Sequence, residues 1–235
     1  MIRLNIYAHR GLFDNKKIVE NTISAFKKAL LDNLNIELDI RVTKDKKIIV
    51  FHDSNIKRLT GIDRLVKDMT YEELKDISLL NTTDKIPLLE DVLHLVSGRV
   101  TLLIELKENF SSNTLKELNK LLLDYNGEVL LQSFNPIILR KMALTSLKRY
   151  KIGILLTSEY KGFKGALYNA FFYKYLIKQK YISFISSPKE LVFKVKEVSN
   201  KELFIWTIKT KNEFIKYKKY SNNLICGQKG IVRVK

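Results

Sequence analysis

Short apolar segments alternate with amphipathic segments along nearly the whole chain, and this alternation limits the folds open to it. Nine segments have the composition of buried strands, and apolar residues at helical spacing fill most of the intervals between them. Parallel strands joined by crossover helices are buried on both faces and carry such continuous apolar runs. The expected strands are residues 4–8, 36–40, 48–51, 100–106, 129–131, 152–156, 181–185, 203–208 and 224–225.

The alternation predicts a parallel α/β protein, and it favours a (β/α)8 barrel of the TIM type. Nine strand-like segments are one more than this barrel needs, so one of them is expected to be an extra strand. Only residues 41–47 separate the second segment from the third, which is too short for a crossover helix. We expect a single domain over residues 1–235. A doubly wound open sheet is the alternative, but no glycine-rich phosphate loop follows the first segment.

Helices are expected in most of the intervals between the strands. The first begins after Asn21-Thr22, a pair of residue types that favour the N-cap position. Pro87 and Pro136 each stand where a helix would begin, as proline does at a first helical turn. The expected helices are residues 23–33, 70–77, 87–95, 112–125, a segment from 136 onward, 163–179, 188–198 and 212–220.

Polar residues lie at or near the downstream ends of several predicted strands. In a closed parallel barrel these ends meet on one face, which is where such barrels carry their active sites. We therefore expect these residues to form one site. They are His9, Arg10, Glu37, Asp39, His52, Glu105, Lys107, Gln132 and Trp206.

Three carboxylates are candidate metal ligands. Glu37 and Asp39 stand two positions apart in an apolar strand, so they share one of its faces. Burying two acids side by side is costly unless positive charge holds them, and either neighbouring Arg and Lys side chains or a divalent cation would supply it. Glu105, at the end of another strand, favours the cation. Ligands that are all oxygen atoms indicate Ca²⁺ or Mg²⁺ more than zinc.

Two histidines are candidates for acid–base chemistry. His9 and His52 each follow a predicted strand, and they are two of only three histidines in the chain. A pair of imidazoles can supply one proton donor and one acceptor near neutral pH. The third, His94, lies within a helical segment and is expected to be structural.

Positive charge accompanies both sets of candidates. Arg10 follows His9 directly, and Lys107 lies two residues after Glu105. A phosphate bridging a metal ion, an arginine and a lysine would neutralise all three. The set therefore predicts metal-assisted cleavage of a phosphorus ester. Retaining glycosidases also use carboxylates at strand ends of barrels, but they need neither a metal nor an Arg/Lys pair.

The formal net charge is +17, which raises the question of an anionic partner. The excess is mostly lysine spread along the chain, so we attribute most of it to composition and expect no nucleic-acid partner. The single cysteine, Cys226, excludes a disulfide framework and a cysteine zinc site, and it fits a reducing compartment. No signal segment opens the chain and no apolar run could span a membrane, so a soluble, cytoplasmic protein is expected.

With these residues in place, the chain resembles the glycerophosphodiester phosphodiesterase family. Nine short segments occur in the order typical of that family and span nearly the whole chain, which makes the resemblance specific. They are Ala8-His9-Arg10-Gly11, Glu20-Asn21-Thr22, Glu37-Leu-Asp39, Val42-Thr43-Lys44-Asp45, His52-Asp53, Ile86-Pro87-Leu88-Leu89-Glu90, Glu105-Leu-Lys107, Gln132-Ser133-Phe134 and Trp206-Thr207-Ile208.

The resemblance implies a (β/α)8 barrel of the phospholipase-C-like phosphodiesterase type. It implies hydrolysis of a small-molecule glycerophosphodiester to sn-glycerol 3-phosphate and an alcohol, in which the neighbouring glycerol hydroxyl attacks phosphorus to give a cyclic phosphate that water then opens. It further implies one divalent cation, Ca²⁺ or Mg²⁺. The implied roles are acid–base catalysis by His9 and His52, cation binding by Glu37, Asp39 and Glu105, phosphate contact by Arg10 and Lys107, and lining of the substrate pocket by Phe134 and Trp206.

The chain also departs from the family pattern near its end. Lys209 stands after the Trp-Thr-Ile segment, where the family usually has Asn, and residues 223–230 replace the family's closing Gly-Ile-Ile-Thr-Asp-x-Pro pattern. The interval between His52 and Pro87 is short, so no large lid domain is expected there.

Residues 161–181 are rich in aromatic and apolar side chains with flanking lysines. They could rest on an anionic membrane, or they could form a barrel helix packed on the sheet or on a second subunit of a homodimer. We favour packing over peripheral membrane contact. The side chains concerned are Phe163, Leu167, Phe171, Phe172, Tyr175 and Leu176.

Two further functions remain open beside the glycerophosphodiester reading. The first is phospholipase-D-like or lysophospholipase activity on lipid phosphodiesters, with the same kind of site. The second is non-catalytic anion binding that uses the net charge of +17. No nucleic-acid-binding module supports the second reading, and it is the less favoured of the two.

Overall fold

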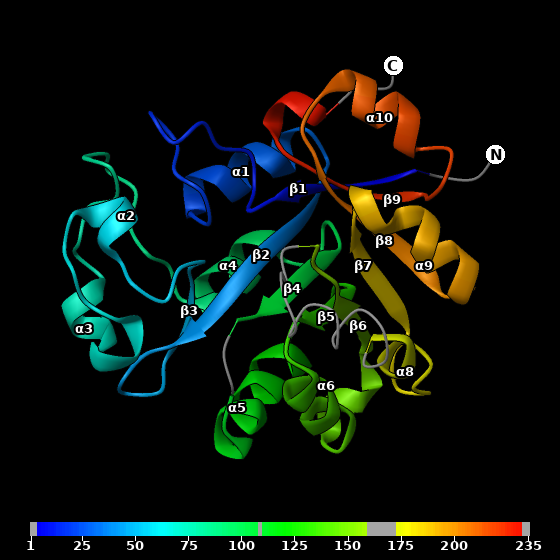
Figure 1. Ribbon diagram of the computed structural model, residues 1–235. Coiled ribbons are helices and arrows are strands. Elements are labelled where there is room, and N and C mark those ends of the chain that lie inside the picture. Colours follow the sequence, from blue (N-terminus) through cyan, green and yellow to red (C-terminus); the bar gives the residue numbers. More distant parts are fainter. Residues whose placement is uncertain (1–3, 108–109, 159–172, 232–235) are drawn as a thin grey trace.

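The computed structural model describes residues 4–107, 110–158 and 173–231, and within them eight parallel strands close into a barrel (Figure 1). The order around the barrel is β1-β9-β8-β7-β6-β5-β4-β2, and pairing of β1 with β2 completes the ring. This confirms the predicted (β/α)8 architecture. The barrel strands are β1 (Asn5–His9), β2 (Asn35–Val42), β4 (Leu102–Leu106), β5 (Val129–Ser133), β6 (Lys151–Leu155), β7 (Phe184–Pro188), β8 (Glu202–Ile208) and β9 (Asn223–Cys226).

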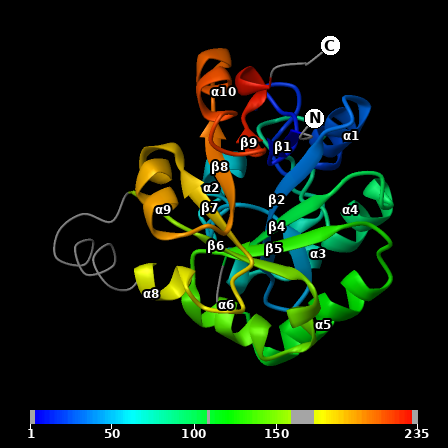
Figure 2. The same cartoon turned by 90° about the vertical axis from the view of Figure 1, so that its right-hand side faces the viewer.

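Helices cover the outside of the ring of strands, as Figure 2 shows. The side chains that cap these helices are of the types that favour the N-cap position. Thr22, one of the predicted pair, caps the first helix by accepting the Ala25 N–H. The outer helices are α1 (Ile23–Leu31), α4 (Leu89–Val96), α5 (Ser112–Leu123), α6 (Pro136–Ala143), α8 (Tyr173–Ile177), α9 (Val192–Val198) and α10 (Lys211–Tyr217).

The extra strand is β3 (Ile48–Val50), which pairs antiparallel with the end of β2. Ile40 lies opposite Val50 and Val42 opposite Ile48, so the two strands form a hairpin across the short connection between them. The sequence pattern left open which of nine segments was extra. The antiparallel pairing decides it, because a hairpin partner cannot take a place among parallel barrel strands.

Two hydrophobic layers follow from the alternation of side chains along each strand. One layer lies between strands and helices and includes Ile36, Leu38 and Ile40 of β2, all fully buried. A smaller cluster gathers the side chains of the opposite strand faces inside the barrel, with Trp206 packed against it. It consists of Tyr7, Leu103, Leu130, Phe184, Phe204 and Ile225.

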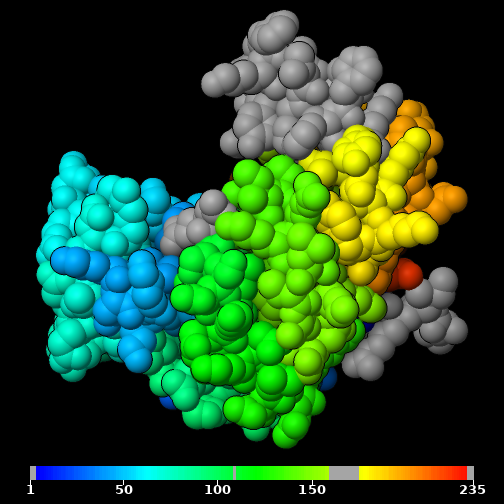
Figure 3. All heavy atoms as spheres, turned by 90° about the horizontal axis from the view of Figure 1, so that it is seen from below, coloured from blue at the N-terminus to red at the C-terminus, as the bar shows by residue number. Residues whose placement is uncertain are grey.

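An inserted segment, residues 53–86, connects β3 to α4 and contains α2 (Lys57–Thr60), α3 (Tyr71–Leu74) and a 3-10 turn, Val66–Asp68. Its apolar side chains form a hydrophobic cluster with Val19, Ile49 and Phe51, separate from the main core. In the space-filling view the segment forms a cyan lobe beside the green helices (Figure 3). The cluster contains Val19, Ile49, Phe51, Ile56, Leu59, Val66, Met69, Leu74, Leu79 and Ile86.

Several boundaries differ from the expectations. The strand expected over residues 181–185 is β7, Phe184–Pro188, and the helix expected over residues 70–77 is only α3, Tyr71–Leu74. Pro188 is the last residue of β7 and not the start of a helix, and a 3-10 turn, Lys189–Leu191, precedes α9. Of the helix expected over 163–179, the structure describes only α8, in which Tyr175 is exposed and Leu176 is buried. The other aromatic and apolar positions singled out there, Phe163, Leu167, Phe171 and Phe172, lie outside the described residues. Within the described ranges, no helix has the length and apolar character needed to cross a membrane.

Candidate active site

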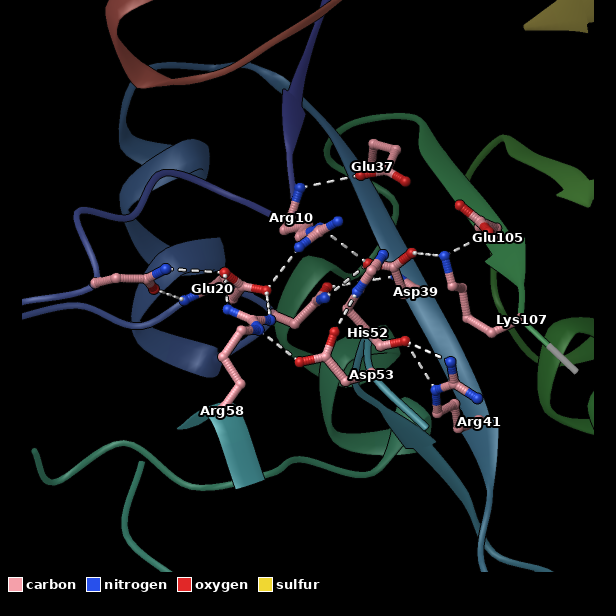
Figure 4. Close-up of polar contacts among 12 residues, drawn as sticks. Arg10, Glu20, Glu37, Asp39, Arg41, His52, Asp53, Arg58, Glu105 and Lys107 are labelled. Carbon is pink, nitrogen blue, oxygen red and sulfur yellow. Dashed lines mark hydrogen bonds and ion pairs between the residues drawn. The ribbon is translucent and has the colours of Figure 1, made fainter. Parts of the chain in front are cut away.

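The register of the barrel strands brings the three acids together. His9 lies opposite Glu37 across β1 and β2, and Asp39 lies opposite Glu105 across β2 and β4. Because Glu37 and Asp39 alternate with the outward-facing Ile36, Leu38 and Ile40, their side chains point into the barrel. All three acids are buried, and one oxygen from each lies within 4.8 Å of the others. Figure 4 shows Glu37 and Asp39 on β2 and Glu105 on the neighbouring β4.

Two positively charged side chains, Lys107 and Arg10, contact this acidic cluster. The Lys107 ammonium lies 2.7 Å from Glu105 Oε1 and 3.5 Å from Asp39 Oδ1. The Arg10 guanidinium approaches Asp39 from the other side, with 3.3 Å between Nε and Oδ2. Glu37 accepts the backbone N–H of Arg10 at 3.0 Å. The five residues predicted for metal and phosphate binding therefore lie in direct contact with one another.

The pKa values of the acids differ because their surroundings differ. Burial and the neighbouring Asp39 and Glu105 raise the pKa of Glu37 well above its ordinary value. Burial and Asp39 likewise raise the pKa of Glu105 to about 7, against the opposing effect of Lys107. For Asp39, burial is outweighed by Lys107 and Arg10, which hold its pKa below the ordinary range.

Those raised pKa values come first from burial and then from repulsion among the neighbouring carboxylates, and both causes bear on the metal. A hard divalent cation prefers oxygen ligands, and it would relieve the repulsion that Lys107 and Arg10 leave. Three buried carboxylates with their oxygens within 4.8 Å of one another fit such an ion. The donor set of Glu37, Asp39 and Glu105 could therefore hold a metal ion, as the sequence predicts.

The two candidate histidines border the same cluster. His9 ends β1 beside Glu37, and burial, reinforced by Arg10, lowers its pKa to about 3. Burial also lowers the pKa of His52, although Asp39 opposes this. The Nδ1 atom of His52 lies 2.6 Å from Asp53 Oδ1, and Arg41 donates from Nε and Nη2 to the His52 carbonyl at 2.8 and 2.6 Å. The third histidine, His94, is exposed on α4, apart from this cluster.

The loop after β1 has a backbone that only a few residue types tolerate. Arg10, with φ +56°, and Gly11, with φ +80°, both occupy the left-handed region, and a Cβ at Gly11 would lie 2.8 Å from that of Ala25. Asn21, also left-handed at φ +57°, donates from Nδ2 to Asp39 Oδ2 at 2.9 Å. The residue expected as an N-cap candidate thus binds a predicted metal ligand, while Thr22 performs the capping.

A second layer of charged residues surrounds the first. Glu20 is buried and bonds the Arg10 guanidinium at 2.7 Å and the Arg58 guanidinium at 2.7 Å. Arg58 also reaches Asp53 at 2.5 Å. No role was expected for Arg58, because it lies in a short helix of the inserted segment where no periodic pattern marks it. In the sequence, only the segments that resemble the family mark Glu20 and Asp53.

The two aromatic residues predicted for the pocket lie together near Lys107. The rings of Phe134 and Trp206 meet edge to face with centroids 5.9 Å apart, and the Lys107 ammonium lies 5.8 Å from the centre of the Phe134 ring. The indole N–H of Trp206 is buried without a hydrogen-bond partner among the described residues. Gln132, from the same strand end as Phe134, is buried and accepts the Ser186 hydroxyl at 2.6 Å.

Known proteins with similar sequences agree on one family. The model of the glycerophosphoryl diester phosphodiesterase family matches residues 9–227. A glycerophosphodiester phosphodiesterase of Caldanaerobacter subterraneus subsp. tengcongensis is 36% identical over 162 residues, which are 64% of this chain and 65% of that protein. Lysophospholipase D GDPD1 of Homo sapiens is 32% identical over 134 residues, covering 52% of this chain and 41% of the relative. These matches therefore span two thirds or less of the relatives.

Solved structures show the same fold over nearly the whole chain. A glycerophosphodiester phosphodiesterase from Thermotoga maritima has a TM-score of 0.77 at 24% identity, covering 97% of this chain and 96% of that one. An Oleispira antarctica phosphodiesterase, solved with its product sn-glycerol-3-phosphate, has a TM-score of 0.78 at 18% identity, covering 96% and 94%. The family match, which covers residues 9–227 of a chain with this fold, shows that the chain belongs to the glycerophosphoryl diester phosphodiesterase family.

Proposed function

We propose that this protein hydrolyses glycerophosphodiesters to sn-glycerol 3-phosphate and an alcohol, with the help of one divalent cation, Ca²⁺ or Mg²⁺. The observation that supports this most is the buried cluster of Glu37, Asp39 and Glu105, contacted by Arg10 and Lys107. A site with this combination of charges suits a phosphodiester, which needs both a cation and hydrogen-bond donors around its oxygens. The Oleispira antarctica phosphodiesterase, which has a similar fold and was solved with sn-glycerol-3-phosphate, supports the same class of ligand.

The three acids would hold the cation, and Arg10 and Lys107 would bind the phosphate oxygens. When bound, the cation would polarise the phosphoryl group and offset charge that builds up on its oxygens. Arg10 is kept in place by Glu20 and Asp39, and Lys107 by Glu105 and Asp39, so neither side chain must be ordered when the substrate arrives.

His52 and His9 would divide the proton transfers. Since Asp53 engages Nδ1 of His52, Nε2 is left as the acceptor, which suits His52 to take the proton of the attacking glycerol hydroxyl. His9 would then donate to the leaving alkoxide, and water would open the cyclic phosphate formed by that attack to give sn-glycerol 3-phosphate. Burial and Arg10 keep its pKa near 3 in the free protein, but an anionic phosphodiester beside it would raise that pKa. Phe134 and Trp206 would contact the glycerol carbons.

The test is release of sn-glycerol 3-phosphate from glycerophosphocholine. Wild-type protein should be active with Ca²⁺ or Mg²⁺ and inactive in chelator. His9→Ala and His52→Ala should each lower kcat by about 100- to 10,000-fold, the usual contribution of a general acid or base. His94→Ala is the matched control, because His94 is exposed on α4, and it should turn over like the wild type. Wild-type turnover in either of the first two variants would refute the assigned roles, and salt-sensitive anion binding without hydrolysis would favour the non-catalytic reading.

Lysophospholipase D activity is the second candidate. It is favoured by the human lysophospholipase D that is 32% identical over 134 residues. Both reactions cleave a phosphodiester, and they differ in whether an acyl chain must fit beside the glycerol. Release of choline from lysophosphatidylcholine, measured beside release from glycerophosphocholine under the same conditions, distinguishes them by the ratio of kcat/KM values.

We also propose that the protein works in the cytoplasm. Cys226, its only cysteine, is a free thiol buried at the end of β9, as suits a protein that needs no oxidising compartment. Fractionation of cells that express the native protein would test this, and recovery mainly in a membrane or extracellular fraction would contradict it.

A further inference from the structure

One arginine outside the barrel connects the two sides of the site. Arg58 lies on α2 of the inserted segment, and its guanidinium holds two carboxylates at once. Its Nε lies 2.5 Å from Asp53 Oδ2. Its Nη2 and Nη1 donate to the two oxygens of Glu20 at 2.7 and 3.2 Å. A guanidinium suits this arrangement, because its donors form a rigid fork that can engage two acceptors at fixed angles.

Each of the two carboxylates holds one residue of the proposed machinery. The second oxygen of Asp53 lies 2.6 Å from Nδ1 of His52, and Glu20 Oε1 accepts Nη1 of Arg10 at 2.7 Å. The contacts therefore run without a gap from His52 through Asp53, Arg58 and Glu20 to Arg10, as Figure 4 shows. Arg58 itself is not in the inner cluster of Glu37, Asp39 and Glu105.

The inserted segment is built to hold this arginine in place. Leu59, next to Arg58, is buried in the separate hydrophobic cluster of the segment. Asp84, at the end of the same segment, makes a second contact with the loop that carries Glu20. Its Oδ2 atom accepts the Val19 N–H at 2.8 Å. Asp84 and Val19 are both buried. The segment thus fixes the loop between β1 and α1 from two points, and Arg58 is the point that also touches Asp53.

We infer that Arg58 is a positioning residue, which holds the His52 imidazole and the Arg10 guanidinium in a fixed relation through Asp53 and Glu20. Without it, Asp53 could rotate away from Nδ1, and His52 would lose the contact that keeps Nε2 as the acceptor. Glu20 would keep Arg10 and Asn15, whose Nδ2 donates to Oε2 at 2.8 Å, but would lose both of its bonds to Arg58. This role deepens the proposed phosphodiesterase activity and rests on it.

The kinetic test compares Arg58→Met with Arg64→Met. Arg64 is a matched control: it lies in the same inserted segment, pairs with Glu73 at 3.0 Å, and its side chain is as exposed as that of Arg58, at 45%. Arg58→Met should lower kcat for glycerophosphocholine by about 10- to 100-fold, the range for partners that orient active-site groups, with KM changed much less. Arg64→Met should keep wild-type kcat. Equal kcat values for the two variants, at equal fractions folded, would overturn the inference.

Arg58→Lys separates charge from geometry. Lysine keeps the positive charge, but a single ammonium cannot form the fork that engages Asp53 and Glu20 together. We therefore expect kcat of this variant to remain well below that of the wild type. Full activity of Arg58→Lys would show that charge alone suffices and would overturn the bridging role.

A spectroscopic measurement decides the inference independently of turnover. With only three histidines, the imidazole nitrogens can be assigned in proton–nitrogen correlation spectra by comparison with His9→Gln and His94→Gln. Wild-type His52 should be the Nδ1–H tautomer, and Arg58→Met should convert it to a mixture, while Arg64→Met should not. An unchanged His52 tautomer in Arg58→Met would overturn the inference. If the wild type hydrolysed no glycerophosphodiester, the proposed function would fail, and these spectra would still decide whether Arg58 positions His52.

Discussion

At the scale of single residues, this site is a balance of buried charges, and Glu20 shows how that balance is kept. Burial alone would raise its pKa, but the bonds from Arg58 and the charge of Arg10 lower it to about 2. A carboxylate that is more acidic in the folded protein than in the unfolded chain stabilises the fold at neutral pH. The same pairing that orients Arg10 and Arg58 therefore contributes to stability.

Glu20→Gln should weaken the fold in a pH-dependent way. The wild-type carboxylate stabilises the fold above the pKa it has when unfolded, and this is lost as the pH falls from about 4.5 toward 2. The difference in unfolding free energy between wild type and variant, measured with urea, should be at most about 3 kcal/mol near pH 7 and should shrink at acid pH. Glu73→Gln, at an exposed pair with Arg64, is the control and should show a smaller difference. A difference that stays constant with pH would contradict this.

Glu37→Gln should separate cation binding from fold stability. Because Glu37 is buried beside Asp39 and Glu105, removing its charge removes repulsion. In chelator, the Tm of the variant should therefore be at least as high as that of the wild type. Wild type should gain about 2.7 kcal/mol, or roughly 5 to 10 °C in Tm, when Ca²⁺ or Mg²⁺ is at 100 times its Kd. The variant should lose most of that gain. Calorimetry that finds equal gains in both proteins would remove Glu37 from the ligand set.

At the scale of elements, the loop between β1 and α1 carries much of the site, and its backbone leaves little freedom. Arg10 donates its backbone N–H to Glu37, and the next residue, Gly11, turns the chain toward α1. The left-handed conformation and the close approach of Ala25 both favour glycine at this position. The position of Arg10 thus depends on a residue that has no side chain.

Gly11→Ala should be clearly destabilising. The new methyl group would lie 2.8 Å from Ala25 Cβ at φ +80°, so the variant combines backbone strain with overpacking, at a cost of roughly 2 kcal/mol or more. Gly61→Ala is a close control. It shares the left-handed backbone, at φ +79°, but among the described residues no atom beyond its two chain neighbours lies within 4 Å of the added carbon, so about 1 kcal/mol is expected. Thermal unfolding would compare them, and equal losses would show that the contact with Ala25 does not matter.

At the scale of the whole molecule, a closed barrel and an inserted segment meet at one site. The barrel supplies acids and histidine from adjacent strands, and the inserted segment supplies Arg58 from outside. Around them the chain carries a net charge of +17. A field of that sign speeds the approach of anionic ligands, and dissolved salt screens it.

Salt should therefore affect substrates according to their charge. For a glycerophosphodiester with an uncharged alcohol, which is a net anion, kcat/KM should fall several-fold between low and high ionic strength, with kcat nearly constant. Glycerophosphocholine, whose charges cancel, should respond less. Steady-state kinetics with both substrates in one salt series makes the comparison. An identical salt response for the two would show that the net charge does not steer the substrate.

The sequence by itself determined the class of fold and most of the inner site. Apolar periodicity is a local property, and the chemistry of Glu37, Asp39, Glu105, His9 and His52 depends on residue type and on position at strand ends, both of which can be read along the chain. The barrel is confirmed, and the predicted residues lie together, while their roles remain predictions.

Only the tertiary structure decided which strand was extra and which residues support the inner site. β3 was identified by its antiparallel pairing with β2, and the pairs of acids by strand registers between distant segments. Arg58 reaches Glu20, 38 residues earlier in the chain, because the inserted segment packs against the barrel. Such contacts depend on how separate elements dock, which no local pattern of polar and apolar residues records.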